Sequence, residues 1–175
     1  SSAASDVYKR QGVNIPEYEV VPPEYVKPFT EILRKEGYYC ANNFKCDYQF
    51  NAPFTAWDEV SSSVSFRDAP KNKPFFYVWN TLITHESRIW ERSNEPLTVD
   101  PDEVIIPDYF PDIPEVRMDI ARKYSNIEAM DKKVGELISQ LESDGLLEKT
   151  IIMFWSDHGG NLLRQKRAVG NSGLH

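Results

Sequence analysis

Apolar residues recur at three- and four-residue steps through one long segment of the chain, residues 115–143. This spacing matches the 3.6 residues per turn of an α-helix and predicts a long amphipathic helix. Gly145 follows the segment, and glycine commonly ends helices because it tolerates a positive φ. The apolar positions are Val116, Ile120, Tyr124, Ile127, Met130, Val134, Leu137, Ile138 and Leu141.

Two shorter apolar runs, residues 73–83 and 150–156, flank this helix. Both are rich in aromatic and β-branched residues and apolar on both faces, which predicts strands buried between layers of helices. A strand, a long helix and a second strand form a right-handed βαβ crossover. We therefore predict an α/β protein with a mostly parallel sheet.

The rest of the chain alternates short elements with loops. We expect a short helix over residues 29–37, with Thr30 as its N-cap and Gly37 as its stop. A strand is predicted over 38–43 and one or two helical turns over 55–63. Residues 94–114 contain five prolines, and we expect a long loop there, of a length that is often functional.

The two ends of the sequence suggest a piece of a longer protein. Residues 1–11 lack the apolar core of a signal peptide, and we expect them to be a non-native leader outside the fold. We expect residues 12–175 to be an internal part of a larger catalytic domain. The sequence therefore leaves the location of the parent protein open.

Composition and charge exclude some classes of function. The net charge of −7 argues against a nucleic-acid-binding protein, and no apolar run is long enough to span a membrane. The sequence contains two cysteines, Cys40 and Cys46. A disulfide between them is possible, but two thiols do not identify the compartment.

Polar residues gather where the predicted strands end, at residues 42–45, 84–88 and 157–158. In parallel sheets, ligands bind beyond the carboxyl ends of the strands. Asp157 offers an oxygen ligand for a metal, and His85 titrates near neutral pH and suits a general acid or base. Lys45 and Lys166 could hold an anion.

Each of these residues also has a purely structural interpretation. Asp157 could cap a turn at a strand end, and His85 could be a hydrogen-bonded loop residue. Most lysines are solvated surface residues. Asn42 and Asn43 are as consistent with a turn as with a ligand site, and the four tryptophans are more typical of core than of a sugar platform.

Three segments together resemble the type I sulfatases of the alkaline phosphatase superfamily. Residues 124–160 are similar to the family's long helix, its following strand and its metal-binding turn. In residues 31–45, a Gly-Tyr pair precedes a lysine with the family's spacing, from Gly37 to Lys45. Residues 73–87 are similar to the strand that carries the family's catalytic histidine. Within the family, residues 47–50 and 84–87 are most similar to bacterial polysaccharide sulfatases of the heparan N-sulfatase-like branch.

The resemblance implies an alkaline-phosphatase-like three-layer sandwich, incomplete in this chain, and a role for each candidate. Asp157 and His158 would lie at a Ca²⁺ ion, and Lys45 and Lys166 would hold the sulfate oxygens. His85 would protonate the leaving atom, and Arg88 would contact substrate. The implied substrate is a sulfated carbohydrate, and the implied location of the parent is periplasmic or secreted.

The sequence departs from the family pattern in three ways. The family's nucleophile is a formylglycine, made by a maturation enzyme in a Cys/Ser-x-Pro-x-Arg motif, and this sequence has no such motif. Asp47 replaces a histidine that usually contacts that nucleophile. Ca²⁺ prefers oxygen ligands, so Asp157 is a better ligand than His158.

We therefore expect a fragment of a sulfatase that is inactive by itself. Two alternatives remain at this point. One is a phosphodiesterase or phosphonate hydrolase of the same superfamily, and the other is a catalytically dead module that binds sugar anions.

Overall fold

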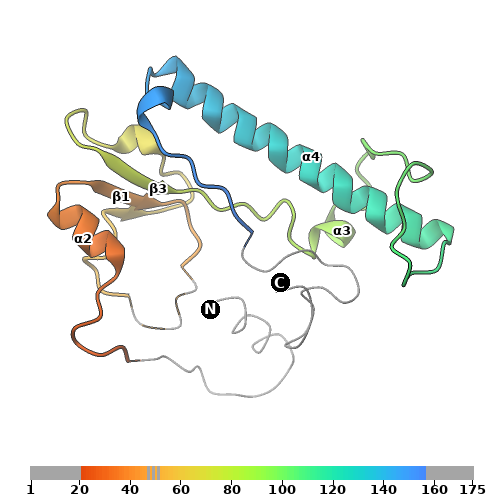
Figure 1. Ribbon diagram of the computed structural model, residues 1–175, viewed down its shortest axis with the longest axis horizontal. Helices are drawn as coiled ribbons and strands as arrows, with labels where there is room; N and C mark the ends of the chain where they lie inside the picture. The colour runs from red at the N-terminus through yellow and green to blue at the C-terminus, as the bar shows by residue number, and fades with distance from the viewer. Residues whose placement is uncertain (1–20, 47, 49, 51, 157–175) are drawn as a thin grey trace. The chain divides into compact units, whose positions relative to one another are not determined.

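The computed structural model describes residues 21–46, 48, 50 and 52–156 (Figure 1). The chain folds into two compact units, and in the described residues the boundary between them lies between Asn80 and Thr81. The first unit contains a small parallel sheet, and the second contains the long helix.

The sheet has three parallel strands in the order β2-β1-β3 (Figure 1). Strand β1 spans Tyr39–Asn42, β2 spans Glu59–Val60 and β3 spans Phe75–Val78. The central strand β1 is almost entirely buried because it pairs on both edges. The parallel sheet predicted from sequence is confirmed, and β1 and β3 lie within the predicted ranges.

Aromatic side chains pack around β3. The ring of Phe76 lies 5.1 Å from that of Phe29 and 6.1 Å from that of Trp57, and Phe75 stacks on Phe66 at 5.5 Å. Phe66 begins a short 3₁₀ helix, η1, at Phe66–Asp68. The residues of β3 are only half-buried, so the prediction that this strand is buried on both faces was wrong within the described structure.

Helix α2, Phe29–Lys35, precedes β1. Its N-cap is Pro28, and Thr30 lies buried inside the helix, so the prediction of Thr30 as N-cap was wrong. The preset φ of proline favours a helix start without a capping side chain. Gly37 has a φ of 91° just beyond the helix, which confirms it as the stop.

Residues 55–63 do not form the predicted helical turns; they contain β2. The apolar spacing of this segment is too short to establish a period. What decides its conformation is pairing with the buried edge of β1, where Ala41 faces Glu59 and Asn42 faces Val60. Tertiary contact has overridden a weak local preference here.

Helix α4, Pro114–Ser143, dominates the second unit (Figure 1). Its 30 residues span about 45 Å at ~1.5 Å per residue. Proline occupies its first turn, and Gly145 follows it with a φ of 66°, so the predicted helix and its end are confirmed. Ile120 and Ala121 pack on Val104 of the loop before the helix. The predicted long loop over 94–114 is also present, except that its last residue, Pro114, begins the helix.

A short helix, α3, spans Arg88–Glu91 before α4, and a 3₁₀ helix, η2, spans Leu147–Lys149 after it. Beyond η2, residues 151–156 form no strand and are exposed, with Ile151 88% and Trp155 65% accessible. The predicted buried strand, and with it the βαβ unit, was therefore wrong for the described part of the chain. An apolar segment forms a buried strand only where a neighbouring strand offers an edge to pair with, and the apolar pattern alone does not supply that edge.

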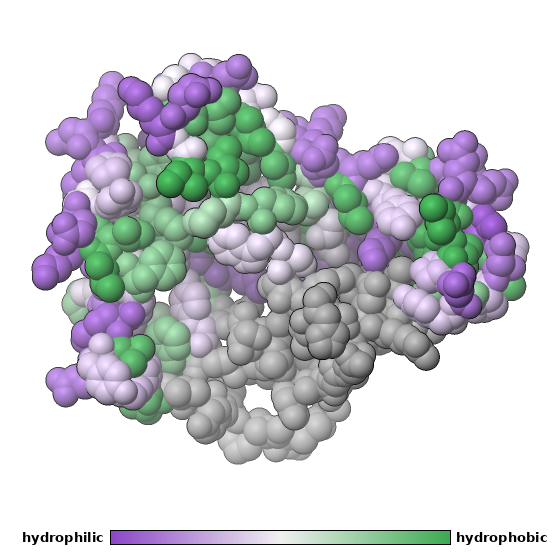
Figure 2. Space-filling view, viewed as in Figure 1, coloured by the Kyte–Doolittle hydropathy of each residue, from purple (hydrophilic) through white to green (hydrophobic). Residues whose placement is uncertain are grey.

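Hydrophobic residues reach the surface at several separate places on the face drawn in Figure 2. In the described part of the chain, large hydrophobic residues that are at least 68% accessible include Tyr25, Phe54, Ile105, Ile151 and Phe154. Within the described residues, no helix is both long and apolar enough to cross a membrane.

Candidate active site

A polar turn follows β1 and carries the first predicted site residue, Lys45. The turn begins at Asn42, the last residue of β1, and Asn43, which are only 1% and 7% exposed. The Asn43 backbone N–H continues the pairing with β3 by donating to the Val78 carbonyl at 3.0 Å. The sheet therefore fixes the point from which the turn starts.

Three asparagines join the carboxyl ends of β1 and β3. Asn80, two residues beyond β3, donates from its side-chain amide to Oδ1 of Asn42 at 2.8 Å and to Oδ1 of Asn43 at 3.1 Å. Its backbone N–H also donates to Oδ1 of Asn43, at 2.8 Å, and its carbonyl accepts from Nδ2 of Asn43, at 2.9 Å. Buried amides need such partners because an unpaired one costs roughly 1–3 kcal/mol.

The other end of the Asn42 amide holds the turn. Its Nδ2 donates to the Lys45 carbonyl at 2.8 Å and contacts Cys46 Sγ at 3.2 Å and Tyr48 Oη at 3.3 Å. Trp57 Nε1 donates to the same phenol oxygen at 2.8 Å. Burial, and next the neighbouring Cys46 thiol, raise the pKa of Tyr48 to about 12, so the phenol keeps its proton and serves as a neutral hydrogen-bonding group.

The two cysteines lie in different surroundings. Cys40 is fully buried in β1 and Cys46 is exposed on the turn, and both thiols are free. Burial, and next the Asp58 carboxylate, raise the pKa of Cys40 to about 11. A protonated thiol is a poor nucleophile, so Cys40 is a core residue.

His85 lies in a turn of the second unit and is half-buried. The Ser87 backbone N–H donates to His85 Nδ1 at 3.2 Å, and Ser87 Oγ lies 3.1 Å from the same nitrogen. The N–H contact requires a bare Nδ1, which assigns the proton of the neutral ring to Nε2. Ser87 thus holds the neutral ring of His85 in the tautomer that carries its proton on Nε2.

Arg88 is the first residue of α3, and its backbone N–H donates to the His85 carbonyl at 3.0 Å. Its guanidinium pairs with Glu91 one helical turn later, and its Nε donates to the Leu82 carbonyl at 3.3 Å. The structure therefore brings Arg88 and His85 together on one turn. The Arg88 side chain is held locally by Glu91 and the Leu82 carbonyl, and its contact with substrate stays a prediction.

The remaining predicted site residues, Asp157, His158 and Lys166, lie outside the described residues, as does Asp47. Within the described part, no group of three or more acidic, histidine or cysteine side chains is arranged to hold a metal ion. The described residues thus do not by themselves form a metal site. The donor chemistry of Asp157 fits a hard divalent cation, whereas the imidazole of His158 suits softer metals.

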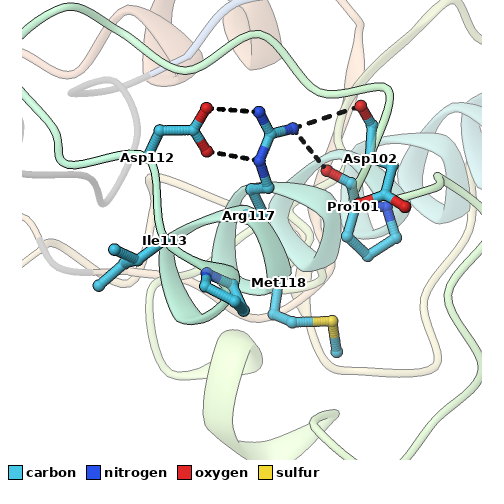
Figure 3. Close-up of a pocket in the computed structure, with 7 residues that line it drawn as sticks. Pro101, Asp102, Asp112, Ile113, Arg117 and Met118 are labelled. Carbon is cyan, nitrogen blue, oxygen red and sulfur yellow. Dashed lines mark hydrogen bonds and ion pairs between the residues drawn. The ribbon is translucent and has the colours of Figure 1, made fainter.

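A hollow of about 420 Å³ opens at the start of α4 (Figure 3). Arg117 crosses it and forms a fork with Asp112, with Nε–Oδ1 2.5 Å and Nη2–Oδ2 2.7 Å apart. Its Nη1 donates to the carbonyls of Pro101 and Asp102 at 3.2 and 3.3 Å. Hydrogen bonding to Arg117 lowers the pKa of Asp112. The Arg117 guanidinium thus anchors the loop before α4 to the helix. No predicted site residue lines this hollow.

Comparisons with known proteins match these features to one family. The family model described as Sulfatase matches residues 35–173. The chain belongs to the sulfatase family. This membership implies an α/β fold and a divalent metal in the complete enzyme, and it confirms the resemblance found from sequence.

Two relatives illustrate the similarity. The chain is 40% identical to an ulvan-active sulfatase of Formosa agariphila over 196 aligned residues, which cover 92% of this chain and 33% of the relative. It is 36% identical to the human N-sulphoglucosamine sulphohydrolase over 64 residues, 37% of this chain and 13% of that enzyme. The chain therefore spans at most about a third of either relative. No solved structure matches.

Two residues of this polar cluster, Asn80 and Tyr48, were not predicted from the sequence. They complete the hydrogen bonding of Asn42 and Asn43, which were candidates. Asn80 was recognisable as a polar residue just after the strand that became β3. For Tyr48 the sequence offered no comparable signal, because its role depends on a turn that brings it back to β1.

Proposed function

We propose that the protein to which this chain belongs hydrolyses sulfate from a carbohydrate. One observation supports the placing of this chemistry: Lys45 sits on a turn that buried asparagines fix to the carboxyl ends of two parallel strands. Strand ends of this kind are where α/β proteins bind ligands. A rigid support suits a lysine that must meet a tetrahedral anion at a fixed position.

We assign the residues as follows. Lys45 and Lys166 hold the sulfate oxygens and offset charge that develops in the transition state. His85 gives a proton to the leaving atom, with Ser87 supporting its Nδ1. Arg88 is retained as a secondary substrate contact, available if its ion pair with Glu91 opens.

We further propose Asp157, with His158 nearby, as part of the site for one Ca²⁺ ion. The bound ion would polarise the sulfuryl group. The sequence has no Cys/Ser-x-Pro-x-Arg motif, so we place the formylglycine nucleophile, and the remaining metal ligands, in parts of the protein outside this chain. A maturation enzyme would generate that formylglycine.

We propose that residues 12–175 form part of the catalytic domain, an alkaline-phosphatase-like three-layer sandwich, and that residues 1–11 are a leader outside it. The family match over residues 35–173 supports the first assignment. We also propose, from the family resemblance, that the protein acts in the periplasm or outside the cell.

The substrates to test can be ranked from the names of the two relatives and from how much of this chain each one matches. The ulvan-active sulfatase aligns with 92% of this chain and the N-sulphoglucosamine enzyme with 37%, so we propose an O-sulfated polysaccharide before an N-sulfated sugar. The test is to express the full-length protein with its maturation enzyme and to measure sulfate released from ulvan, N-sulfoglucosamine and an aryl sulfate. An aryl phosphodiester serves as the comparison substrate.

Sulfate release that exceeds phosphodiester turnover supports the proposal. Faster phosphodiester turnover would show a phosphoryl-transfer enzyme, and sugar binding without turnover, after confirmed formylglycine formation, would show a binding module. The present chain, tested alone, should release no sulfate.

A further inference from the structure

We propose that Asn42 is a positioning residue for Lys45: its buried amide fixes the backbone of the turn that carries the lysine. This inference deepens the proposed function and rests on it, because it concerns how the sulfate-binding lysine is held. Asn42 itself need not touch substrate.

Burying the Asn42 side chain costs free energy unless its amide is hydrogen-bonded. Asn42 is 1% exposed and ends the only strand of the described sheet that pairs on both edges. An apolar residue would fill this place without any need for hydrogen bonds. An amide there is stable only when both its ends are satisfied, so its partners reveal its role.

The Asn42 amide joins a residue beyond β3 to the backbone of Lys45. Its Oδ1 accepts from Asn80 beyond β3, at 2.8 Å, and its Nδ2 donates to the Lys45 carbonyl, also at 2.8 Å. The amide has two N–H groups, and the contacts with Cys46 Sγ and Tyr48 Oη are longer, at 3.2 and 3.3 Å. The bond to Lys45 is therefore the closest of its donations.

Asparagine often bonds to a backbone group a few residues on, simply to stabilise a turn. Here the same amide also reaches a residue 38 positions away in the sequence. The turn is thus tied to a second strand as well as to its own start. Lysine has a long flexible stem, so fixing its backbone narrows the volume that its ammonium samples and places it more often on the anion.

Asn43 provides a matched control. It is 7% exposed, adjacent in sequence and hydrogen-bonded at both ends of its amide. Those bonds go to Asn80, in contrast to the Lys45 carbonyl that Asn42 holds. Replacing either asparagine with leucine removes a buried amide of similar size, so the two variants should lose comparable stability while differing at Lys45.

The experiment uses the full-length, matured protein with Asn42→Leu or Asn43→Leu, each with Lys45 intact and with Lys45→Ala. Three quantities are measured for each variant: kcat and KM on an aryl sulfate, the inhibition constant of inorganic sulfate, and the melting temperature. Asn42→Asp is a second variant, which keeps the acceptor for Asn80 but removes the donor to Lys45, in case the leucine variant does not fold.

We expect Asn42→Leu to lower kcat/KM about tenfold or more, as supporting groups behind a ligand commonly do, and to weaken sulfate inhibition. Asn43→Leu should change both less than about threefold at a similar melting temperature. In the Lys45→Ala background, Asn42→Leu should lower kcat/KM little further, because the effects of two mutations at residues in contact are not additive.

Two results would overturn the positioning role. Either the two asparagine variants lose activity in proportion to their melting temperatures, or the Asn42 effect persists in full without the Lys45 side chain. Normal sulfatase activity of the Lys45→Ala variant would overturn the assignment of Lys45 as a sulfate-binding residue, and the positioning role of Asn42 with it. A matured parent protein that releases no sulfate would instead overturn the proposed function, on which the positioning role rests.

Discussion

The Asp58 carboxylate accepts a 2.8 Å hydrogen bond from the backbone N–H of Cys40, and the backbone N–H of Asp58 donates to the Cys40 carbonyl at 2.8 Å. These two bonds hold a negative charge against a buried thiol. Arg34 pairs with the same carboxylate at 2.9 Å and only partly offsets it. Cys40 is consequently kept protonated, whereas Cys46 lies exposed on the turn.

The two thiols should therefore react at very different rates. At pH 8 we expect a thiol reagent such as DTNB to modify Cys46 rapidly and Cys40 only after the protein is unfolded in urea. The reason is that burial raises the pKa of Cys40 to about 11 and also blocks access. Peptide mapping identifies the modified residue, and the Cys46→Ser variant is the control. Rapid labelling of folded Cys46→Ser would contradict the placement of Cys40.

The same burial predicts a loss of stability in alkali. Burial raises the pKa of Cys40 from 9.0 to about 11, and burial together with Glu59 raises that of Tyr39 from 10.0 to about 12. A raised acid pKa favours the neutral form in the fold, so the stability is present below about pH 9 and is lost as pH rises toward 12.

Urea unfolding at several pH values checks this. The Cys40→Ala variant should be less stable at pH 8 but should lose stability less steeply between pH 9 and 11. Parallel curves for the two proteins would show that Cys40 does not titrate in this range.

Arg122 should stabilise the second unit through the loop that precedes α4. It is 5% exposed, and its guanidinium donates to the carbonyls of Ser93, Glu95 and Pro96. Arg122→Met would leave these acceptors without their donor, at a cost of about 1–3 kcal/mol in the free energy of unfolding.

Lys133→Met is the control on the same helix. Its ammonium pairs with Glu136 at 2.8 Å, with both side chains about half exposed, and such pairs contribute roughly 0–1 kcal/mol. Denaturant unfolding of the two variants gives the comparison. Equal or greater stability of Arg122→Met would mean that desolvation of the guanidinium outweighs its hydrogen bonds.

His85 should matter most where the leaving group is poor. In the full-length protein, His85→Ala should lower kcat about 10²–10⁴-fold on a sugar sulfate, the range of general acid catalysis. A nitrophenyl sulfate releases a nitrophenolate, which is stable enough to leave without protonation. The loss of kcat on that substrate should therefore be much smaller. Equal losses on both substrates would indicate that His85 acts by binding rather than by proton transfer.

Sequence patterns predicted the elements whose stabilising contacts are local. Helix α4 and its end at Gly145 followed from a period sustained over eight turns and a glycine with positive φ. Strands β1 and β3 were also predicted, from the residues of each segment, although the two strands pair across a long stretch of chain. Family resemblance, rather than periodicity, identified the protein class.

The errors concern features that depend on distant partners. Strand β2 is two residues long and exists because Glu59 and Val60 pair with β1. The segment over 151–156 has the composition of a strand yet is exposed in the described structure. Likewise, Lys45 was selected as a site residue from sequence, but its support by Asn42 and Asn80 requires the sheet to be built first.

The all-parallel sheet also has a kinetic consequence. Its contacts close long stretches of chain: Cys40 and Asp58 are 18 positions apart, and Asn43 and Asn80 are 37 apart. Loop closure must precede such pairing, whereas α4 can form from contacts within a few residues. Once its residues are available, the helix should therefore form faster than the sheet, and the asparagine-supported turn should become ordered only after β1 and β3 have paired. Mutations that slow strand pairing would then reduce the yield of active protein without altering any residue that touches sulfate.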